Sequence, residues 1–572
     1  PMGRFDLISK GKVKDSILDM SRGVALLNGK TSAFIIMGKD LLYVESANFA
    51  IEPVPNNSPE VLEYRKKYRI PEPELFRRDK IVGWLQENPG DSVMCAACFK
   101  RKDGILITAV LADDAASAIE KAEKMLYEAE EFFTALRRTE TFYRKWWKKT
   151  PEIKLSEPRH QTLFDYGMFR LSGFTQPGMP APTLQGPWIE DDRMPPWQSD
   201  YHFNINVQMA HWPMLPGNHP EQFEPLAKML KSWMPQMREY AKSFVGIDDG
   251  FMLPHGCDDK CCPADTNWKC QFDVGSAGWT ALMLWDLYRY YSDKDCLSEV
   301  AFPLMRGALR VYEAMIEKTD GVFYATSPEY IPPRGYAWGK NPSFHLAVIH
   351  SLIKGCIESV NLLGIKEKRA EGWKKMADKL PKATLDGNEI LVWEGLPLRE
   401  SHRHHSHLAG IYPFDIFDID DKDRNIVENS LWRWTGCGTG GWTGWCTTWA
   451  AIIWARLGNA HAAYSIIDHY ERFFTGPNYF SSHNAFHRGF TTFLNERPPY
   501  IMQMDAVCGA VTAIMEMIVH ERGGVIRTAP AVPEEWGDVE FKNIRLPSGK
   551  TAFGTVKNAK PKILISSDNR VI

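Results

Sequence analysis

The strongest constraint on the fold is a series of helical segments between about residues 159 and 522 that come in pairs joined by short turns. Apolar side chains recur at every third or fourth position in residues 276–291 and 296–318. The same pattern pairs residues 444–458 with residues 460–474. Repeated helical hairpins with long loops at one end predict a closed α/α toroid. A helical solenoid is the alternative architecture, although no fixed repeat period is visible.

The two ends of the chain are predicted to form strands. Residues 31–46 and 92–112 have the character of strands, and the second stretch contains a hairpin-like turn at residues 102–104. A polar, Pro-rich insertion at residues 52–74 interrupts this region. Residues 113–149 are strongly helical, and strands return from about Val525. The N-cap predicted for the long helix is Asp113 or Asp114.

These patterns predict a multidomain, mainly α protein. Its toroid is flanked by an N-terminal β-sandwich-like region and a small C-terminal β domain. The expected domains are an N-terminal β region at 1–112, a helical linker at 113–158, a helical barrel at 159–522 and a C-terminal β domain at 523–572. A length of 572 residues agrees with several domains.

Composition and charge narrow the class of partner. A formal net charge of −3 provides no electrostatic footprint for nucleic acid or for an anionic membrane. No apolar run is expected to be long enough to span a bilayer. The N-terminus shows no basic segment followed by an apolar one, so secreted, periplasmic and cytoplasmic locations all stay open, as does the oligomeric state. The 20 tryptophans favour a ligand that stacks on aromatic rings.

The 11 cysteines have no regular spacing. Cys95 and Cys98 form a C-x-x-C, and a cluster follows His255. Zinc sites need paired knuckles or histidine pairs at ligand spacing, so free thiols are expected here, with a local disulfide or a structural metal as alternatives. The cluster consists of Cys257, Cys261, Cys262 and Cys270.

Residues 184–213 are predicted to form the wall of a ligand pocket. They read LQGPWIEDDRMPPWQSDYHFNINVQMAHWP, with tryptophans, histidines and acids close together. In an extended segment, residues two apart point to the same side, so Asn204 and Asn206 are expected to aim both amides into one pocket. Aromatic faces stack on sugar rings, and amides and imidazoles hydrogen-bond hydroxyls. A polar loop with ordinary aromatic packing is the alternative.

A second group of residues has the chemistry for acid–base catalysis. Glu329 lies in a Pro-bounded loop, Asp505 precedes the last long helix, and Asp191 and Asp192 belong to the pocket segment. Cleavage of a glycosidic bond needs an acid for the leaving oxygen and a group that activates water or attacks the anomeric carbon.

Residues 399–413 are rich in histidine, which indicates sugar contacts or, as the alternative, a metal site. These histidines are His402, His404, His405 and His407.

Taken together, the motifs resemble glycoside hydrolase family 95, the inverting α-L-fucosidases and their α-L-galactosidase relatives. The likeness runs in order over most of residues 120–540. The matching motifs are LQGPW…PPWQSDYHFNINVQM, SAGWTALMLWDLYRYY, EVAFPLM…DGVFYATSPE, HRHHSHLAGIYP, GWTGWCTTWAAIIWARLG, QMD and GGVIRTAPAVPEEW. The resemblance implies an N-terminal β domain, a helical linker, an (α/α)6 barrel and a C-terminal β domain.

The resemblance also implies roles for particular residues. Glu329 matches the general acid, Asn204 and Asn206 match the amides that position the attacking water, and Asp505 matches the carboxylate that activates an asparagine. It implies an oligosaccharide or polysaccharide substrate, with no metal and no cofactor. The expected sugar contacts are Trp197, His202, His255, His402 and His407.

The chain departs from the family pattern at four places, and two other functions stay open. The strand region before the linker helix is much shorter than the family's N-terminal β domain. Ile189 stands where the family usually has asparagine, residues 505–510 read DAVCGA where it has DGNFGG, and the cysteine cluster replaces an aromatic–histidine stretch. One alternative is a glycoside phosphorylase on a similar toroid, with Arg403 or Arg334 at the phosphate. The other is a non-catalytic sugar-binding protein, in which Glu329 or Asp505 would normally be lost.

Overall fold

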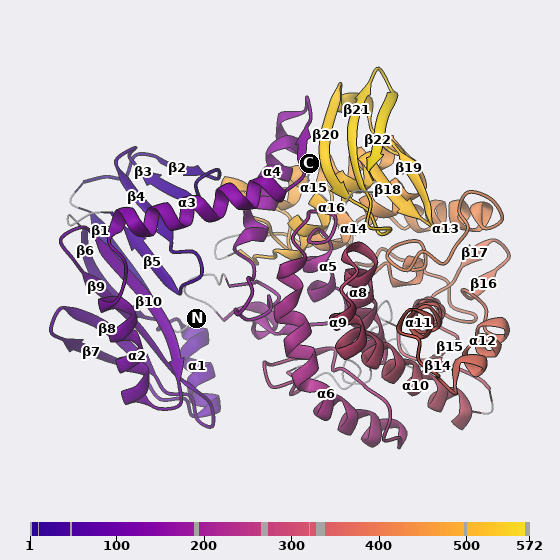
Figure 1. Cartoon of the computed structure of the whole chain (residues 1–572), viewed down its shortest axis with the longest axis horizontal. Helices are drawn as coiled ribbons and strands as arrows, with labels where there is room; N and C mark the ends of the chain where they lie inside the picture. The colour runs from indigo at the N-terminus through magenta and orange to yellow at the C-terminus, as the bar shows by residue number, and fades with distance from the viewer. Residues whose placement is uncertain are drawn as a thin grey trace. The chain divides into compact units, whose positions relative to one another are not determined.

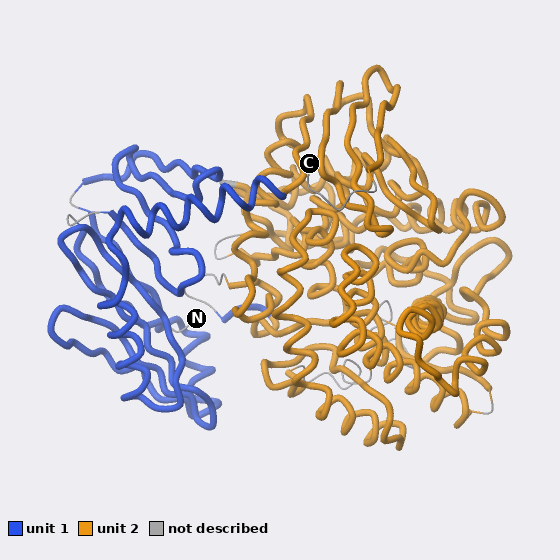
Figure 2. The backbone as a smooth tube through the Cα atoms, in the orientation of Figure 1, with its two compact units in different colours: residues 1–149, 189–196 blue, residues 150–188, 197–572 orange. Residues whose placement is uncertain are grey.

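The chain divides into two compact units, residues 1–149 with 189–196 and residues 150–188 with 197–572 (Figure 2). The expected class is confirmed, because the protein is multidomain and largely helical, with β structure toward both ends of the chain. The four predicted domain boundaries are finer than this division and stay predictions. The computed structural model describes residues 3–9, 11–45, 49–187, 194–264, 273–319, 321–327, 338–496 and 500–566.

Unit 1 is built on an eight-stranded antiparallel sheet in the order β2-β3-β4-β5-β10-β9-β8-β7 (Figure 1). α2 (Ala115–Tyr127) and α3 (Phe132–Lys149) contribute to the core on one face of it. On the other face, β1 (Gly3–Ser9) pairs with β6 (Phe49–Pro55), and their apolar side chains pack on β5 and β10. The sheet strands are β2 (Ser16–Asp19), β3 (Val24–Leu27), β4 (Thr31–Ile35), β5 (Leu41–Val44), β7 (Glu74–Arg78), β8 (Ile81–Gln86), β9 (Val93–Lys100) and β10 (Ile105–Ala112).

Two local predictions for unit 1 are confirmed. The Arg101 amide donates to the Gly104 carbonyl at 2.8 Å, which closes the hairpin between β9 and β10. Asp114 is the N-cap of α2, and its Oδ1 accepts from the Ser117 amide at 2.9 Å. The insertion at residues 52–74 includes the end of β6, α1 (Pro59–Tyr68) and the start of β7.

The segment expected to be helical over residues 113–149 forms two helices, because the chain breaks between α2 and α3. The Arg101 guanidinium donates to the carbonyls of Ala129 and Glu130, each at 2.9 Å, and so occupies acceptors that a continuous helix needs. The amide of Phe132 then donates to Asp103 Oδ2 at 3.2 Å at the start of α3. A tertiary contact from the β9–β10 turn therefore divides the helix.

Unit 2 combines fully buried helices with amphipathic ones. α14 (Gly444–Arg456) is buried along its whole length and packs against α15 (Ala460–Phe474) and α16 (Asp505–Ile518). α15 buries only one stripe, which is the pattern of a helix that covers a core. α8 (Gly275–Tyr291) packs against α10 and α11. The other helices in the described part of unit 2 are α4 (Pro158–Ser172), α5 (Asn206–His211), α6 (Glu224–Val245), α9 (Lys294–Cys296), α10 (Phe302–Lys318), α11 (Ser343–Leu363), α12 (Ala370–Lys379) and α13 (Arg424–Gly436).

Within the described part of the chain, α11 is the one helix long and apolar enough to cross a membrane by length and composition. This differs from the expectation that no apolar run has that length. The helix has 56% of its most apolar window buried, and it packs against α8 and α10. Burial inside a helical core accounts for such a composition.

The C-terminal strands begin earlier than predicted and include a strand from far upstream. β18 (Val519–Arg522) follows α16 directly and pairs with β19 (Val525–Thr528) through a turn at Gly523 and Gly524, both at positive φ. A four-stranded sheet has the order β11-β20-β21-β22. Its strands are β11 (Glu152–Lys154), β20 (Val539–Arg545), β21 (Thr551–Lys557) and β22 (Lys560–Ser566).

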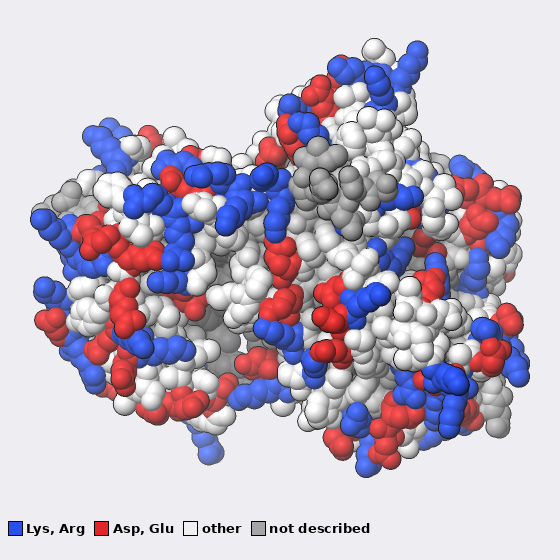
Figure 3. Space-filling model, in the orientation of Figure 1, with Lys and Arg blue, Asp and Glu red and all other residues white. Residues whose placement is uncertain are grey.

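Acidic and basic side chains are interspersed on the surface. On the face shown in Figure 3, Lys and Arg alternate with Asp and Glu over both units. This mixed pattern agrees with the formal net charge of −3. It is the pattern of an ordinary solvated surface.

Candidate active site

Asp505 is a buried carboxylate paired with an amide. It is the first residue of α16, and only 1% of it is exposed. Its Oδ2 accepts a short hydrogen bond from Nδ2 of Asn206, and its Oδ1 accepts from the Ala506 amide at 2.6 Å. Burial raises the pKa of Asp505 to about 7, against the opposing effect of the Asn206 hydrogen bond. The carboxyl group therefore titrates near neutral pH.

The extended geometry expected for Asn204 and Asn206 is wrong. Among the described residues, strand β12 (Tyr201–His202) pairs with β13 (Gly256–Cys257) alone, and the ladder ends at His202. The chain then turns at Ile205, with φ −168° and ψ −34°, and Asn206 begins α5. The two amides consequently reach different partners.

Asn204 is held by a histidine from a distant segment. Its Nδ2 lies 3.0 Å from Nε2 of His404, and both residues are buried. Burial, with a smaller effect from Arg403, holds the pKa of His404 well below its usual value, so the ring is neutral and Nε2 can accept. Oδ1 of Asn204 is buried and has no hydrogen-bond partner within the described residues. A buried polar atom without a protein partner marks a position where a bound water or ligand would satisfy it.

Two further histidines are each held by a carboxylate. His202 Nδ1 lies 3.0 Å from Asp200 Oδ2, and His255 Nδ1 lies 2.9 Å from Asp273 Oδ2. The two imidazole rings meet edge to face, with centroids 4.7 Å apart. Burial raises the pKa of Asp273, but the bond to His255 and the charge of that ring outweigh it and bring the pKa to about 2. The carboxylates fix the orientation of both rings.

Trp197 presents its ring beside these histidines. It is 38% exposed, and its ring centroid lies 5.4 Å from that of His483 and 6.5 Å from that of His202. Its backbone has φ +52°, and the next two residues are also left-handed. Three such non-glycine residues in a row store strain, which is common at ligand sites.

The histidine-rich segment is divided between the site and the core. His402 Nδ1 accepts from the His404 amide at 3.1 Å, and the two rings lie 5.2 Å apart. His405 is fully buried and accepts from Trp434 Nε1 at 3.1 Å, so it belongs to the core. His407 is also buried, in the short helix Ser406–Leu408. No group of three or more His, Cys, Asp or Glu side chains in the described ranges is arranged to hold a metal ion.

Several predicted residues lie outside the described part of the chain. They are Glu329, Arg334, Asp191, Asp192 and Cys270. The described cysteines are free thiols, and Cys257 and Cys261 are both buried beside the β12–β13 pair.

Sequence reasoning missed Asp200, Asp273 and His483 as parts of this site. Asp200 stands two residues before His202, and that spacing was a usable signal. Asp273 and His483 come from segments with no local signature. Their part in the site follows from tertiary contacts alone.

The family model of the glycosyl hydrolase family 95 catalytic domain matches residues 133–518. The chain is 28% identical over 414 residues to "Alpha-L-fucosidase 2" of Arabidopsis thaliana, which covers 68% of this chain and 47% of that protein. It is 26% identical over 425 residues to "Probable alpha-fucosidase A" of Aspergillus niger, which covers 68% of this chain and 51% of that protein. The chain thus spans about half the length of these curated relatives.

A solved structure shares the fold. It is assigned as a kojibiose phosphorylase from human microbiome, and it superposes with a TM-score of 0.67 at 10% sequence identity. The match covers 99% of this chain and 85% of that chain. At this identity the likeness describes the fold and carries no information on substrate.

Proposed function

The chain belongs to glycoside hydrolase family 95, and from this premise we propose that it is an inverting exo-acting hydrolase that releases a terminal α-L-fucose or the related α-L-galactose from glycans. The names of the curated relatives support α-L-fucose as the first sugar to test. We propose further that the buried and amphipathic helices of unit 2 form an (α/α)6 barrel, with the site at the N-terminal ends of α5, α8 and α16.

The observation that carries the proposal is the buried hydrogen bond from Asn206 to Asp505. An amide alone is a very weak base, and a water molecule held by amides is not activated unless a carboxylate polarises one of them. Asp505 has the burial and the contact for that task.

In the proposed reaction, one water attacks the anomeric carbon from the face opposite the leaving group. Asn204 and Asn206 hold that water through their carbonyl oxygens, and its proton moves toward the Asn206–Asp505 pair. Glu329 gives its proton to the departing glycosidic oxygen as the bond to the anomeric carbon breaks. Because the water enters opposite the leaving group, the configuration inverts. His202, His255, His402, His407 and Trp197 are the proposed sugar contacts.

The test is hydrolysis of nitrophenyl α-L-fucoside and α-L-galactoside, followed by proton NMR of the first sugar formed. We expect the β anomer to appear first and to mutarotate later. First release of the α anomer would contradict the inverting scheme. Turnover that requires inorganic phosphate, with a sugar 1-phosphate as product, would instead support the phosphorylase alternative.

A further inference from the structure

A cavity of about 370 Å³ lies at the opposite ends of the helices that carry the candidate active site. Asp505 begins α16, whereas Glu516, near the end of the same helix, lines the cavity. α5 likewise runs from Asn206 to the cavity wall at His211. At 1.5 Å per residue, Asp505 and Glu516 are roughly 16 Å apart along the helix axis. The cavity is therefore distinct from the candidate active site.

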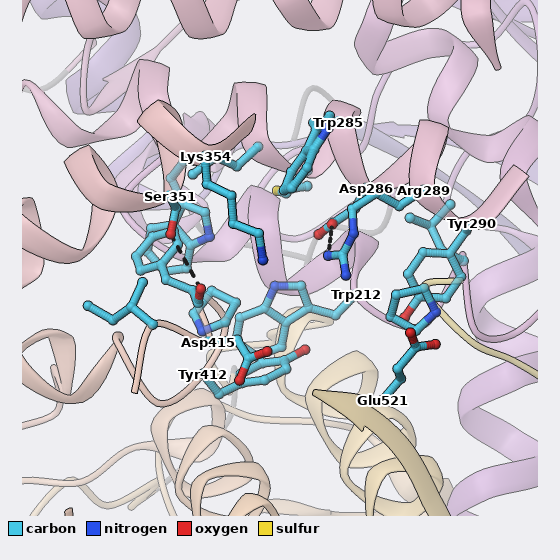
Figure 4. Close-up of a pocket in the computed structure, with 18 of the residues that line it drawn as sticks. Trp212, Trp285, Asp286, Arg289, Tyr290, Ser351, Lys354, Tyr412, Asp415 and Glu521 are labelled. Atoms are coloured by element: carbon cyan, nitrogen blue, oxygen red, sulfur yellow. Dashed lines mark hydrogen bonds and ion pairs between the residues drawn. The ribbon is translucent and has the colours of Figure 1, made fainter. Parts of the chain in front are cut away.

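Aromatic rings form much of the cavity wall. Trp212 and Tyr412 meet edge to face with centroids 4.8 Å apart, and Figure 4 shows both below the ammonium group of Lys354. Trp285 and Tyr290 come from α8. Such rings offer faces on which the C–H groups of a pyranose stack.

The charged side chains that line the cavity balance one another. Four carboxylates and four cationic side chains contribute to the wall, so their formal charges cancel. The two lining histidines, His211 and His350, have pKa values lowered by burial and are neutral at pH 7. A wall of this kind has no net preference for an anion or a cation. The carboxylates are Asp286, Asp415, Glu516 and Glu521, and the cations are Arg289, Lys354, Lys382 and Arg456.

One charged pair is structural. Arg456 Nε lies 2.6 Å from Glu516 Oε2, and both side chains are largely buried. The Arg456 guanidinium also lies 5.1 Å from the centroid of the Tyr412 ring. Arg456 Nη2 also donates to Glu516 Oε1 at 2.7 Å, so the two charges are paired with each other inside the protein.

Other polar groups stay accessible to a ligand. Asp286 and Arg289 are joined at 2.8 Å, yet 39% and 34% of their side chains are exposed. Lys354 is exposed on α11, and its ammonium points toward the same space in Figure 4. Asp415 differs from these groups, because its Oδ1 is buried without a hydrogen-bond partner in the described ranges and its Oδ2 accepts from the Gly523 amide at 2.9 Å.

We propose that this cavity is a second saccharide-binding site, for a neutral mono- or disaccharide. Each sugar hydroxyl both donates and accepts, so it can pair with Asp286, Arg289 and Lys354 without adding charge to a balanced wall. The sugar ring lies against the tryptophan and tyrosine faces. The volume is within the range of small-molecule sites. The proposal rests on the cavity and not on the proposed hydrolysis.

The test is calorimetric titration of the whole protein with L-fucose, D-galactose and D-xylose. We expect at least one of these sugars to bind, and Lys354→Ala and Asp286→Asn each to weaken that binding about tenfold, which is about 1.4 kcal/mol. Lys354 is exposed and Asp286→Asn preserves shape, so both variants should fold. Lys375→Ala, at an exposed position on α12, is the matched control and should leave binding unchanged.

An activity assay distinguishes the cavity from the candidate active site. Hydrolysis of nitrophenyl α-L-fucoside should stay within about twofold in the cavity variants, because they lie outside the candidate active site. If the protein fails to hydrolyse the fucoside but the cavity variants still lose sugar binding, the second site stands while the proposed function falls. The inference is overturned if none of the three sugars binds, if both variants bind as tightly as the parent protein, or if inorganic phosphate binds there more tightly than any sugar.

Discussion

Asn204 and Asn206 are held in the same way by two different acceptors. Asp505 accepts from one amide and the neutral ring of His404 accepts from the other. In each case the NH2 group is committed to the protein. The carbonyl oxygen of each amide is the atom proposed to meet water. The roles of Asp505 and His404 can each be tested by substitution.

Asp505→Asn should lower turnover by about 10²–10⁴-fold, because the neutral amide no longer polarises Asn206. Binding of L-fucose should change little, since water activation contributes in the transition state. Steady-state kinetics and a sugar titration measure both. Adding Asn206→Gly to Asp505→Asn should cost little more than the worse single change. Losses that multiply would show that the two residues act independently.

The raised pKa of Asp505 also predicts a pH dependence. The ionised form is the one that activates Asn206, so kcat/KM should fall as the pH drops below about 7. The free energy of unfolding depends on pH in the opposite direction to kcat/KM. The pKa of Asp505 in the folded state lies above its unfolded value. The contribution of Asp505 to the free energy of unfolding is therefore greatest at low pH and is lost as the pH rises from about 4 through about 7. Asp505→Asn should therefore raise Tm more at pH 8 than at pH 5, and an equal change at both would count against the burial argument.

His404→Ala should lower kcat by about 10-fold to 100-fold with a smaller effect on KM, because Asn204 loses its acceptor and its carbonyl is no longer aimed. His404→Gln supplies a carbonyl acceptor and should recover part of the loss. His461→Ala, at an exposed position on α15, is the control. If the Ala and Gln variants are equally impaired, His404 does not act as a positioning residue.

At the scale of elements, close helix packing places the site. Gly509 on α16 lies against α14 and α5: a Cβ there would stand 2.2 Å from Thr448 Oγ1 and 3.1 Å from Met209 Sδ. Because these helices are buried and tightly packed, the register of α16 determines where Asp505 meets Asn206.

Gly509→Ala should lower the free energy of unfolding by about 1–3 kcal/mol, because the added methyl group overpacks this contact. Gly372→Ala on α12, where a Cβ would meet nothing within 4 Å, should instead raise it by about 0.4–1 kcal/mol through the unfolded state. Chemical denaturation measures both. The same sign for the two variants would contradict the packing argument.

Asp273 links the start of α8 to the site, because it accepts from the Gly275 amide, the Ser276 hydroxyl and His255. Asp273→Ala should cost about 1–2 kcal/mol of stability at pH 7 and raise KM by freeing His255. The pKa of Asp273, about 2, lies below its unfolded value. The stability difference between the parent protein and Asp273→Ala should therefore be present above about pH 4 and vanish as the pH falls toward 2.

The control for this prediction is Asp293→Ala, which removes the N-cap of α9, where Asp293 accepts from the Cys296 amide at 2.9 Å. That cap lies outside the candidate site. It should affect stability without raising KM. Equal KM values for the parent protein and Asp273→Ala would remove Asp273 from the substrate-binding argument.

At the scale of the whole molecule, each of the two units has its own buried core. Leu106 and Leu111 lie on the same strand, β10, yet Leu106 is fully buried and Leu111 is 51% exposed. Leu106→Ala should cost about 2–5 kcal/mol and lower one calorimetric transition while the transition of unit 2 stays in place. Leu111→Ala should leave both unchanged. A single transition that moves as a whole would show that the units unfold together.

Much of the fold could be predicted because it depends on local chemistry. Apolar periodicity predicts the paired helices, Asp114 begins α2 as a side-chain cap should, and the β9–β10 turn closes where the sequence places it. The residues of the candidate site could also be found, because tryptophans, asparagines and histidines gather in short segments. These features need only the neighbours along the chain.

The sequence by itself thus determined the paired helices, the two ends rich in strands and the segments that carry the site. The tertiary structure alone decided which buried polar groups meet. Asn206 and Asp505 are 299 positions apart, and Asn204 and His404 are 200 apart. It also decided the break between α2 and α3, which depends on Arg101. The physical reason is that a buried polar group must find a partner, and packing brings that partner from anywhere in the chain.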